Sequence, residues 1–439
     1  MVSPMASKDS IVALSSGRLP AGIAVIRISG PKTRFVVETI AGPVQDRFTN
    51  LRTIRAADGS TIDHGLVLFF PGPGSFTGED VAEFQVHGSR AVAAKMLERI
   101  TGFEGVRHAE PGEFTRRAFL NGRLDLVETE ALADLVNAET EAQRRFALRN
   151  AEGAQSELYS GWRRRLIHAR AMIEAEIDFA DEEDVPGSVS EAVWSDVTAM
   201  IGEIERHVEG FKAAEIIRDG FEVVILGAPN AGKSSLFNAF ARREAAIVTD
   251  EPGTTRDLLE VVMDLNGLKV RLVDTAGLRD AAGKVESIGI ERARAKADVA
   301  DLVLLLEDMA NPVPVGGVPA GAPLLRIGTK SDIADAGGGA YDLMISSRDG
   351  SGLACLLDEI GSRAAAAVGE AGDVLPSRMR HVELLQEAMD FLRAALSGQS
   401  QELRAEELRL AAERLGRIVG AVDVEDLLDV IFSQFCIGK

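Results

Sequence analysis

Hydrophobic residues near the start of the chain fall in short runs that are bounded by Gly, Pro or Ser. Ile11–Leu14, Gly22–Ile28 and Gly65–Phe70 have this form, which is typical of β-strands. From Arg90 to Ile100 the apolar residues take the three- and four-residue spacing of a helix. The pattern predicts an α+β domain at residues 1–119.

A helical pattern dominates two later stretches. From about Leu124 to Phe211 the chain is charged and rich in Ala, and the only clear break is at Asp184–Gly187. Helical spacing returns from about Ser377 to Phe435. The apolar positions of the two stretches include Leu166, Ile167, Ala171 and Ile173, and Leu408, Ala411, Leu415 and Ile418. We expect long amphipathic helices in both.

Between the helical stretches, strand-like runs alternate with helical ones from Phe221 to about residue 368. Such alternation predicts βαβ units and a parallel sheet. We expect a multidomain α/β protein in which an α-helical domain is split by an inserted, doubly wound domain. The expected boundaries are 1–119, 120–215 for the first helical part, 216–372 for the insert and 373–439 for the second helical part. Two independent helical bundles remain an alternative.

Composition narrows the class of protein. The 439 residues are 46% hydrophobic and 26% charged, as in folded proteins, and the formal net charge is -20. Because binding to phosphate backbones depends on Lys and Arg, a general nucleic-acid-binding surface is disfavoured. Two cysteines are too few for a disulfide framework, and no apolar run is long enough to span a bilayer. We expect a cytoplasmic protein without a membrane segment.

The strand Glu222–Leu226 leads directly into Gly227-Ala-Pro-Asn-Ala-Gly-Lys-Ser234, and a helix is expected to follow. This is the P-loop pattern in its strand–loop–helix context. Glycines allow a tight turn whose N–H groups and following helix N-terminus bind phosphate. Lys233 can reach the β- and γ-phosphates, and the Ser234 hydroxyl can ligate magnesium.

Three further segments follow in the order that a GTP-binding domain requires. Asp274-Thr-Ala-Gly277 follows a strand, so Asp274 can hold magnesium through water and Gly277 can approach the γ-phosphate. The upstream loop Glu251–Asp257 offers a second magnesium hydroxyl, from Thr255. Downstream, Thr329-Lys-Ser-Asp332 presents a carboxylate that can accept from guanine N1–H and its 2-amino group. Ser346–Arg348 would complete the base pocket.

Two positions depart from the usual pattern. Thr329 stands where the guanine motif usually begins with Asn, and we expect guanine specificity to be retained. Leu278 stands where Ras-like enzymes place the Gln that orients the attacking water. The carboxylates within Asp280–Glu286, or a monovalent cation held by Asn230, are candidates for this role. A loop-stabilising role for Asn230 remains equally open.

Several stretches together resemble the MnmE (TrmE) family of tRNA modification GTPases over essentially the whole chain. They are Arg27–Gly30, Phe76–Asp80, Pro111–Phe114, Ala118–Asn121, Gly227–Ser235, Gly253–Asp257, Ile288–Glu291 and Phe435–Lys439. The N-terminal stretches and the terminal Cys-Ile-Gly-Lys are far more selective than the P-loop. The resemblance implies a potassium-stimulated GTPase whose G domain, at 216–372, dimerises to activate hydrolysis.

The resemblance also implies a chemical setting for the GTPase. The family acts with the flavoprotein MnmG (GidA), which holds FAD, in a heterotetramer. Together they add an aminomethyl or carboxymethylaminomethyl group to carbon 5 of the tRNA wobble uridine. The carbon comes from a 5-formyl- or 5,10-methylene-tetrahydrofolate, which binds the N-terminal domain of a homodimer. A ribosome-assembly-type regulatory GTPase and a folate-dependent transferase controlled by its G domain are the alternatives.

Candidate site residues follow from the motifs and from the resemblance. Expected contacts with GTP or GDP are Asn230, Ala231, Gly232, Lys233, Ser234, Ser235, Thr249, Asp250, Glu251, Pro252, Gly253, Thr254, Thr255, Asp274, Thr275, Ala276, Gly277, Thr329, Lys330, Asp332, Ser346, Ser347 and Arg348. Ser234 and Thr255 would ligate Mg²⁺. The expected catalytic residues are Lys233 and Glu286. By resemblance, Glu286 orients the water, K⁺ is held by Asn230, Thr249, Glu251 and Thr254, and folate contacts are Arg27, Glu83, Arg123 and Lys439.

Two other features allow more than one interpretation. Cys436 could take part in one-carbon chemistry as a thiolate, although cysteines near a C-terminal helix more often pack. Arg163–Arg165, with His168 and Arg170, could contact tRNA or an acidic surface, although a solvated helix face is more common.

Overall fold

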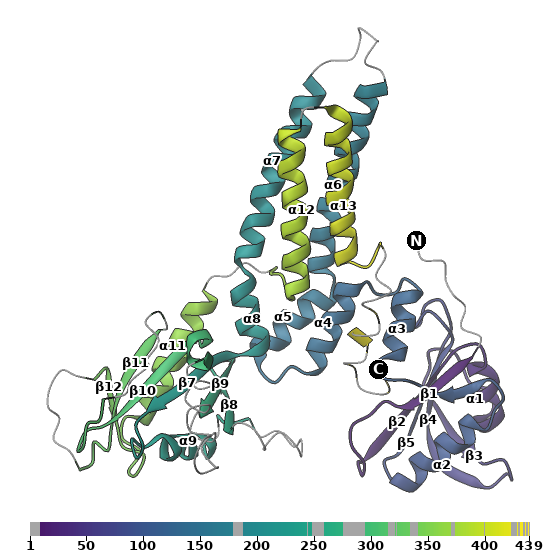
Figure 1. Cartoon of the computed structure of the whole chain (residues 1–439). Coiled ribbons are helices and arrows are strands. Elements are labelled where there is room, and N and C mark those ends of the chain that lie inside the picture. Colours follow the sequence, from purple (N-terminus) through teal and green to yellow (C-terminus); the bar gives the residue numbers. More distant parts are fainter. Residues whose placement is uncertain are drawn as a thin grey trace, which may run out of the picture. The chain divides into compact units, whose positions relative to one another are not determined.

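The structure is a computed structural model. It describes residues 9–178, 188–243, 245–247, 259–274, 295–314, 321, 323–333, 341–369, 374–398, 400–422, 428, 431–432, 435 and 438. The chain divides into two compact units (Figure 1). Unit 1 comprises residues 1–133, 150–198 and 386–439, and unit 2 comprises residues 134–149 and 199–385. None of the described helices is both long and apolar enough to serve as a membrane span.

The N-terminal part of unit 1 is a six-stranded sheet with the strand order β3-β4-β5-β2-β1-β6. Its strands are β1 (Ser10–Leu14), β2 (Ile23–Ser29), β3 (Asn50–Arg55), β4 (Thr61–Phe70), β5 (Val81–His87) and β6 (Val106–His108). Neighbouring strands are antiparallel except β1 and β6. Helices α1 (Thr33–Ala41) and α2 (Arg90–Thr101) contribute to the core on one face, and α3 (Glu113–Leu120) packs on the opposite face of β1.

Alternation of burial along β1 explains this two-sided packing. Val12 belongs to the core with α1 and α2, whereas Ile11 and Ala13 pack with Phe114 of α3. Successive side chains of a strand point to opposite faces, so one strand serves both cores. The strands that the apolar runs predicted are present as β1, β2 and β4. The helix predicted from Arg90 is α2.

Long helices form the rest of unit 1 and part of unit 2. They are α4 (Leu126–Val136), α5 (Glu141–Ala151), α6 (Ala154–Asp178), α7 (Ser188–Glu209), α8 (Phe211–Asp219), α12 (Met379–Ser397) and α13 (Gln401–Ile418). α6, which precedes the insert in sequence, packs along α13, which follows it (Figure 1). Leu408, Ala411, Leu415 and Ile418 are fully buried, as the helical stripe predicted. Ile167 is 47% exposed, so its place in the apolar pattern of α6 was misleading.

The sheet of unit 2 has the strand order β12-β11-β10-β7-β9-β8. Its strands are β7 (Phe221–Gly227), β8 (Leu259–Leu265), β9 (Leu268–Asp274), β10 (Leu302–Asp308), β11 (Leu324–Thr329) and β12 (Leu343–Ile345). All neighbours are parallel except β8 and β9. Helices α9 (Lys233–Ala241) and α11 (Leu353–Val368) pack on one face of the sheet. Residues 297 and 300 contribute to a second core on the other face.

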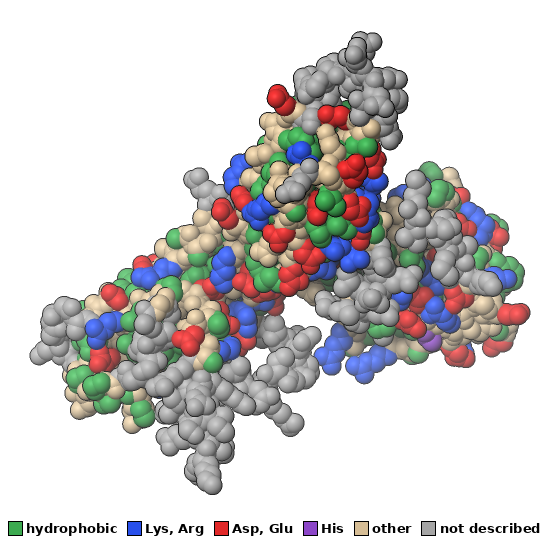
Figure 2. Space-filling view, turned by 45° about the horizontal axis from the view of Figure 1, so that its top comes forward, with side chains coloured by type: hydrophobic (Ala, Val, Ile, Leu, Met, Phe, Trp, Pro, Cys, Tyr) green, Lys and Arg blue, Asp and Glu red, His purple; other side chains and the backbone are tan. Residues whose placement is uncertain are grey.

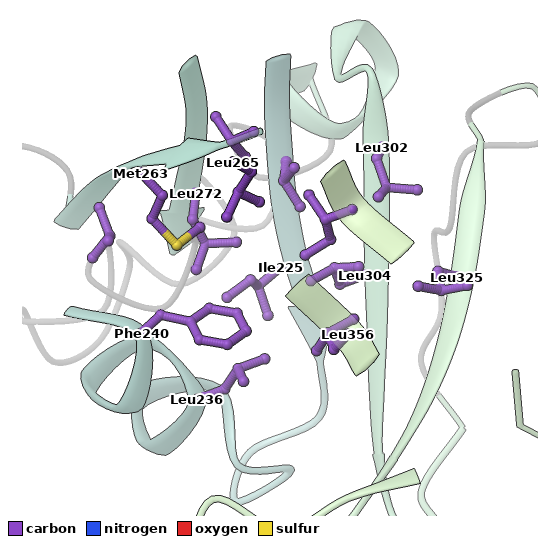
Figure 3. Packing of buried hydrophobic residues seen from close by; sticks show 14 of the residues in the cluster. Ile225, Leu236, Phe240, Met263, Leu265, Leu272, Leu302, Leu304, Leu325 and Leu356 are labelled. Atoms are coloured by element: carbon purple, nitrogen blue, oxygen red, sulfur yellow. The ribbon is translucent and has the colours of Figure 1, made fainter. Parts of the chain in front are cut away.

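The hydrophobic core between α9 and the sheet holds the end of strand β7 in place. Ile225 of β7 lies beside Phe240 of α9 and Leu304 of β10, and Leu236 completes this wall (Figure 3). All four side chains are fully buried. Since burying such a side chain contributes about 1.5–3 kcal/mol, the strand and helix that flank residues 228–232 are held firmly in place.

Candidate nucleotide site

The carboxyl ends of five parallel strands meet at one edge of the unit 2 sheet. Gly227 ends β7, Asp274 ends β9, Asp308 ends β10, Thr329 ends β11 and Ile345 ends β12. Ligands of doubly wound sheets bind beyond this edge. The motifs that the sequence placed on separate strands therefore come together in space.

The glycine-rich turn after β7 has a backbone that few residues tolerate. Gly232 has φ 92°, and Asn230 has φ 68°, a value that Asn adopts more readily than most residues. Gly227 pairs with Leu306 of β10, and a Cβ at Gly227 would lie 2.7 Å from the Leu306 carbonyl oxygen. Gly232 directly precedes α9, so the turn delivers the chain to a helix N-terminus. This geometry suits an anion.

Lys233 projects its ammonium group back across the turn. Its Nζ donates to the carbonyl oxygens of Gly227 at 2.7 Å and Ala228 at 2.8 Å, and the residue is 7% exposed. Ser234 and Ser235, in the first turn of α9, are exposed. A buried ammonium beside two accessible hydroxyls fits a triphosphate and its Mg²⁺. The structure thus brings together the described phosphate-binding candidates.

Thr329 connects strand β11, which leads to the candidate guanine-binding loop, to the glycine-rich turn, where phosphate is expected to bind. It is 3% exposed, and its hydroxyl lies 2.9 Å from the carbonyl oxygen of Ala231 and 3.1 Å from that of Glu307. Its Cβ also lies 3.6 Å from the position of a Cβ at Gly232. The residue that departs from the usual guanine motif therefore ties strand β11 to the glycine-rich turn.

The loop after β11 lies next to the loop after β12. Ser331 N–H donates to the Ile345 carbonyl oxygen at 3.2 Å. The Asp332 side chain is 17% exposed and lies 3.8 Å from Arg348, whose side chain is 83% exposed. Ser346 is fully buried, and its hydroxyl accepts from Arg348 N–H at 3.2 Å. The candidate guanine carboxylate and the second base loop are neighbours.

Lys330 is the first residue of the loop after β11 and has φ 61°. Its ammonium lies 2.5 Å from Asp308 Oδ2, and this hydrogen bond is the main reason why the pKa of Asp308 is lowered. Asp308 thus stays ionised at neutral pH and orients the Lys330 side chain. Sequence reasoning did not single out Asp308, although its place at a strand end was a usable signal.

Other nucleotide candidates lie outside the described residues. They are Thr249, Asp250, Glu251, Pro252, Gly253, Thr254, Thr255, Thr275, Ala276, Gly277 and Glu286. The structure describes Asp274 only as the last residue of β9, and Ser347 as a half-buried turn residue. The roles of these residues stay predictions.

A second cluster lies on the N-terminal sheet. Arg27 of β2 and Glu83 of β5 are cross-strand partners, and their side chains form an ion pair at 2.8 Å. The Arg27 guanidinium carbon lies 6.0 Å from the centre of the Phe76 ring and 5.8 Å from that of Phe114. Its Nη1 also lies 3.5 Å from the Gly438 carbonyl oxygen. Two of the folate candidates are thus in contact.

The other two folate candidates differ in what the structure describes. Arg123 packs near the loop that carries Phe76, because a Cβ at Gly78 would lie 3.3 Å from Arg123 Cγ. Lys439 and Cys436 lie outside the described residues, although Gly438 accepts from the Ser15 hydroxyl at 2.8 Å. Phe76 and Phe114 were not predicted as site residues. Phe76 lies in a glycine-containing loop and is 39% exposed, and the sequence pattern could not predict this exposure.

Three arginines of the basic stretch on α6 are paired with acidic side chains. Arg164 pairs with Glu157 at 2.7 Å, Arg165 with Asp196 at 2.6 Å and Arg170 with Glu174. On the face shown in Figure 2, acidic and basic side chains are interspersed over the helices. This arrangement favours a solvated, ion-paired helix face over a surface that binds tRNA.

A glycine-rich turn ahead of a helix, together with a guanine-type carboxylate loop at the same sheet edge, defines a P-loop GTPase domain. Two family models match the chain: "GTP-binding protein TrmE N-terminus" over residues 10–123 and "MnmE helical domain" over residues 126–436. The second match covers more than half of the chain. The chain belongs to the MnmE family.

Curated relatives match over the full length. The "tRNA modification GTPase MnmE" of Mesorhizobium japonicum is 75% identical, with 99% of this chain and 100% of the relative covered. That of Chelativorans sp. is 58% identical, with 98% of each chain covered. Among solved structures, the G domain of the T. maritima FeoB iron transporter is 27% identical. The match covers 33% of this chain and 98% of the FeoB chain. Its TM-score of 0.25 adds nothing to the family assignment.

Proposed function

We propose that this protein hydrolyses GTP as part of tRNA modification. The observation that carries the proposal is the sheet edge where Lys233, Thr329 and Asp332 lie in one GTPase-type site, within a chain 75% identical to a tRNA modification GTPase. A ribosome-assembly GTPase would need an RNA-binding module. The two family matches instead account for residues 10–123 and 126–436.

The proposed tRNA product is a wobble uridine that carries an aminomethyl or carboxymethylaminomethyl group on carbon 5. A flavoprotein of the MnmG kind would supply FAD and assemble with a homodimer of this chain. The proposed place of action is the cytoplasm. Nucleoside analysis of tRNA from a deletion strain tests the product, and unchanged wobble uridines would remove it.

We further propose that K⁺ stimulates hydrolysis. Asn230 supports this idea, because its exposed amide stands at the left-handed turn of the phosphate loop. Leu278 supports it as well, since leucine cannot orient water. Bound K⁺ and Mg²⁺ would supply positive charge to the triphosphate oxygens. Asn230, Ser234 and Lys233 would hold the triphosphate and its ions, and Glu286 would orient the water.

The test compares GTP turnover in sodium and in potassium at equal ionic strength. Turnover is expected to be slow in sodium and to rise strongly in potassium. Asn230→Gly keeps a residue that accepts φ 68° but removes the amide oxygen, so it should abolish the difference between the salts. Equal turnover of the wild type in both salts would refute the cation mechanism.

The role of Glu286 needs a separate pair of variants. Glu286→Ala should lose turnover and retain GTP binding, because the residue is proposed to act on the water rather than on the nucleotide. Asp280→Ala, in the same stretch, removes the same charge and serves as the matched control. Full turnover in Glu286→Ala would reject the assigned role.

The last proposal is a tetrahydrofolate site in unit 1. Glu83 suits the amide and amino edge of a pterin, and basic side chains such as Arg27, Arg123 and Lys439 suit the carboxylates of the glutamate tail. The Arg27–Glu83 pair at 2.8 Å supports it, with Phe76 offering an exposed ring beside the pair. Calorimetry with 5-formyltetrahydrofolate tests the site.

A further inference from the structure

A partly buried ionic cluster lies next to the proposed folate site. It consists of three carboxylates and two guanidinium groups: Asp9, Glu79, Glu113, Arg107 and Arg117. We call it the Arg117 cluster. The Arg117 side chain is 6% exposed, and those of Glu79 and Glu113 are 14% and 10% exposed. Buried charges persist only when they are paired and hydrogen-bonded, so this cluster constrains its surroundings strongly.

Arg117 contacts all three carboxylates. Its Nη1 donates to both carboxylate oxygens of Glu79 at 3.2 Å and to the Asp9 carbonyl oxygen at 3.0 Å. Its Nη2 donates to Glu113 at 3.0 Å and to the Asp9 carboxylate at 3.1 Å. A planar guanidinium can bridge several acceptors in fixed directions, which a lysine ammonium cannot do in the same geometry.

Glu79 belongs to the loop between β4 and β5. Its carboxylate also accepts from the Ser29 hydroxyl at 2.8 Å, and Ser29 lies 2.7 Å from the Thr77 hydroxyl. The Asn121 amide donates to the Thr77 carbonyl oxygen at 2.8 Å. The loop is therefore anchored at Thr77 and Glu79, on both sides of Gly78 and directly after Phe76.

Glu113 belongs to the first turn of α3 and directly precedes Phe114. Arg117 lies on the same helix, one turn after Glu113, so its bonds to Glu79 join the loop that carries Phe76 to the helix that carries Phe114. Those two rings flank the Arg27 guanidinium, at 6.0 and 5.8 Å from its carbon. The two rings beside Arg27 are therefore carried by the two elements that the Arg117–Glu79 contact connects.

We propose that Arg117 is a positioning residue of the proposed folate site. It sets the spacing between the Phe76 loop and α3, and thereby the placement of Arg27 against Glu83. Arg117 need not contact the ligand, since it acts through the two elements that it joins. The proposal rests on folate binding by this unit.

Arg107 provides a matched control within the same cluster. It pairs with Asp9 at 2.5 Å and with Glu113 at 2.5 Å, and its side chain is 44% exposed. Among the described residues Arg107 makes no bond to Glu79, so it does not join the loop to α3. Arg107→Met and Arg117→Met remove the same charge from the same cluster, and only Arg117→Met cuts the bridge.

The experiment measures the affinity of the full chain for 5-formyltetrahydrofolate by calorimetry, with GTP affinity as a check on unit 2. Arg117→Met should weaken folate binding by about tenfold or more, as misplaced supporting groups commonly do. Arg107→Met should change it by less than about threefold. GTP affinity should be unchanged in both. An equal loss of folate affinity in the two variants, or no loss in Arg117→Met, would overturn the proposal.

A gentler variant covers the case in which Arg117→Met does not fold. Glu79→Gln keeps the shape of the side chain and removes the charge that Arg117 holds, so it should weaken folate binding in the same direction. Folate affinity equal to that of the wild type in Glu79→Gln would contradict the bridge. Failure of the wild type itself to bind the folate would instead refute the folate site, and with it the positioning role.

Discussion

At the scale of single residues, Thr329 stands where the guanine motif usually has Asn, and it still connects strand β11 to the glycine-rich turn. Its hydroxyl reaches the Ala231 carbonyl oxygen at 2.9 Å while the side chain stays buried. Position 329 therefore contacts the phosphate turn, whereas the residue proposed to choose guanine is Asp332, three residues later. The two functions can be separated by mutation.

Thr329→Val keeps the shape of the side chain and removes the hydroxyl. We expect it to weaken GTP and GDP binding by about 1 kcal/mol, or roughly threefold to tenfold, because a buried acceptor loses its donor. Thr329→Ser should bind nearly as the wild type does. The preference for GTP over ATP should persist in both variants. Nucleotide titrations measure these affinities, and wild-type affinity in Thr329→Val would count against the connection.

Asp125 has a raised pKa, which makes the stability of the protein depend on pH. Burial raises its pKa to about 6, and its carboxylate accepts from Glu128 N–H at 2.8 Å just before α4. The folded pKa lies above the unfolded value. Its contribution to stability is therefore fully present below about pH 4 and is lost as the pH rises through 6.

Asp125→Asn keeps an oxygen that can accept from Glu128 and removes the buried charge. We expect the variant to be more stable than the wild type by about 2 kcal/mol at pH 8, a gain that shrinks toward pH 4. Denaturant unfolding at the two pH values measures it. A gain independent of pH would show that burial of the charge is not the cause.

Sequence reasoning reached the residues of the two candidate sites unevenly. Gly227–Ser234 could be predicted because the strand, turn and helix are contiguous in sequence. Arg27 and Glu83 are 56 positions apart, so only the family resemblance brought them together. The contacts of Arg117 with Asp9 and Glu79 could not be predicted, because these partners lie 108 and 38 positions away and no periodicity relates them to Arg117. Only its pair with Glu113 has the i,i+4 spacing of a helix.

At the scale of elements, the N-terminus of α5 belongs with the sheet of unit 2. Ala142 N–H donates to the Gly267 carbonyl oxygen at 3.0 Å, and Glu139 pairs with Lys269 at 2.6 Å. Both contacts lie at the start of β9, whose last residue is Asp274. One strand thus connects a helical segment that precedes the insert in sequence to a proposed magnesium residue.

Gln143 supports this junction from within α5. It is 8% exposed, its Oε1 accepts from Glu139 N–H at 2.8 Å and Thr140 N–H at 3.1 Å, and its Nε2 donates to the Arg218 carbonyl oxygen at 2.7 Å. Gln143→Leu should destabilise unit 2 by about 2–3 kcal/mol, because buried backbone groups lose their partners. Arg145→Leu, at a side chain 76% exposed, should change stability by less than about 0.5 kcal/mol.

The two variants are compared by denaturant unfolding. An equal effect of both substitutions would mean that the junction adds nothing to stability. Helical periodicity predicted α5 but not its place, because an amphipathic face does not specify which neighbour covers it. Strands β3 and β5 were missed for a related reason: their residues are largely polar or alternate in polarity, and no apolar run marks them.

At the scale of the whole molecule, the chain order and the spatial units differ. Residues 134–149 precede the insert in sequence yet belong to unit 2, and α7 and α12 each run through the division between the units. The predicted boundaries at 120–215 and 373–439 followed the change of sequence pattern. They could not reveal which helices pack with which sheet.

Hydrogen exchange with and without GDP tests this assignment. At a hundred times its Kd, a ligand stabilises the unit that it binds by about 2.7 kcal/mol, which slows exchange through opening of that unit by about a hundredfold. We expect this protection in β7, in α9 and in residues 134–149. Peptides from β2 serve as the control and should change little. If GDP slowed hydrogen exchange in β7 but not in residues 134–149, the assignment of that segment to unit 2 would be wrong.

The outer strands of the two sheets have a further consequence, for behaviour at high concentration. Open strand edges recruit strands of other molecules unless they are short, charged or covered. β6 and β12 have three residues each, and β3 carries two arginines and an irregular register. β8 is covered by residues 245–247, through bonds such as that from Ile247 N–H to the Val262 carbonyl oxygen at 2.8 Å. Each sheet therefore resists edge-to-edge aggregation, so the folded chain should stay dispersed when it is concentrated.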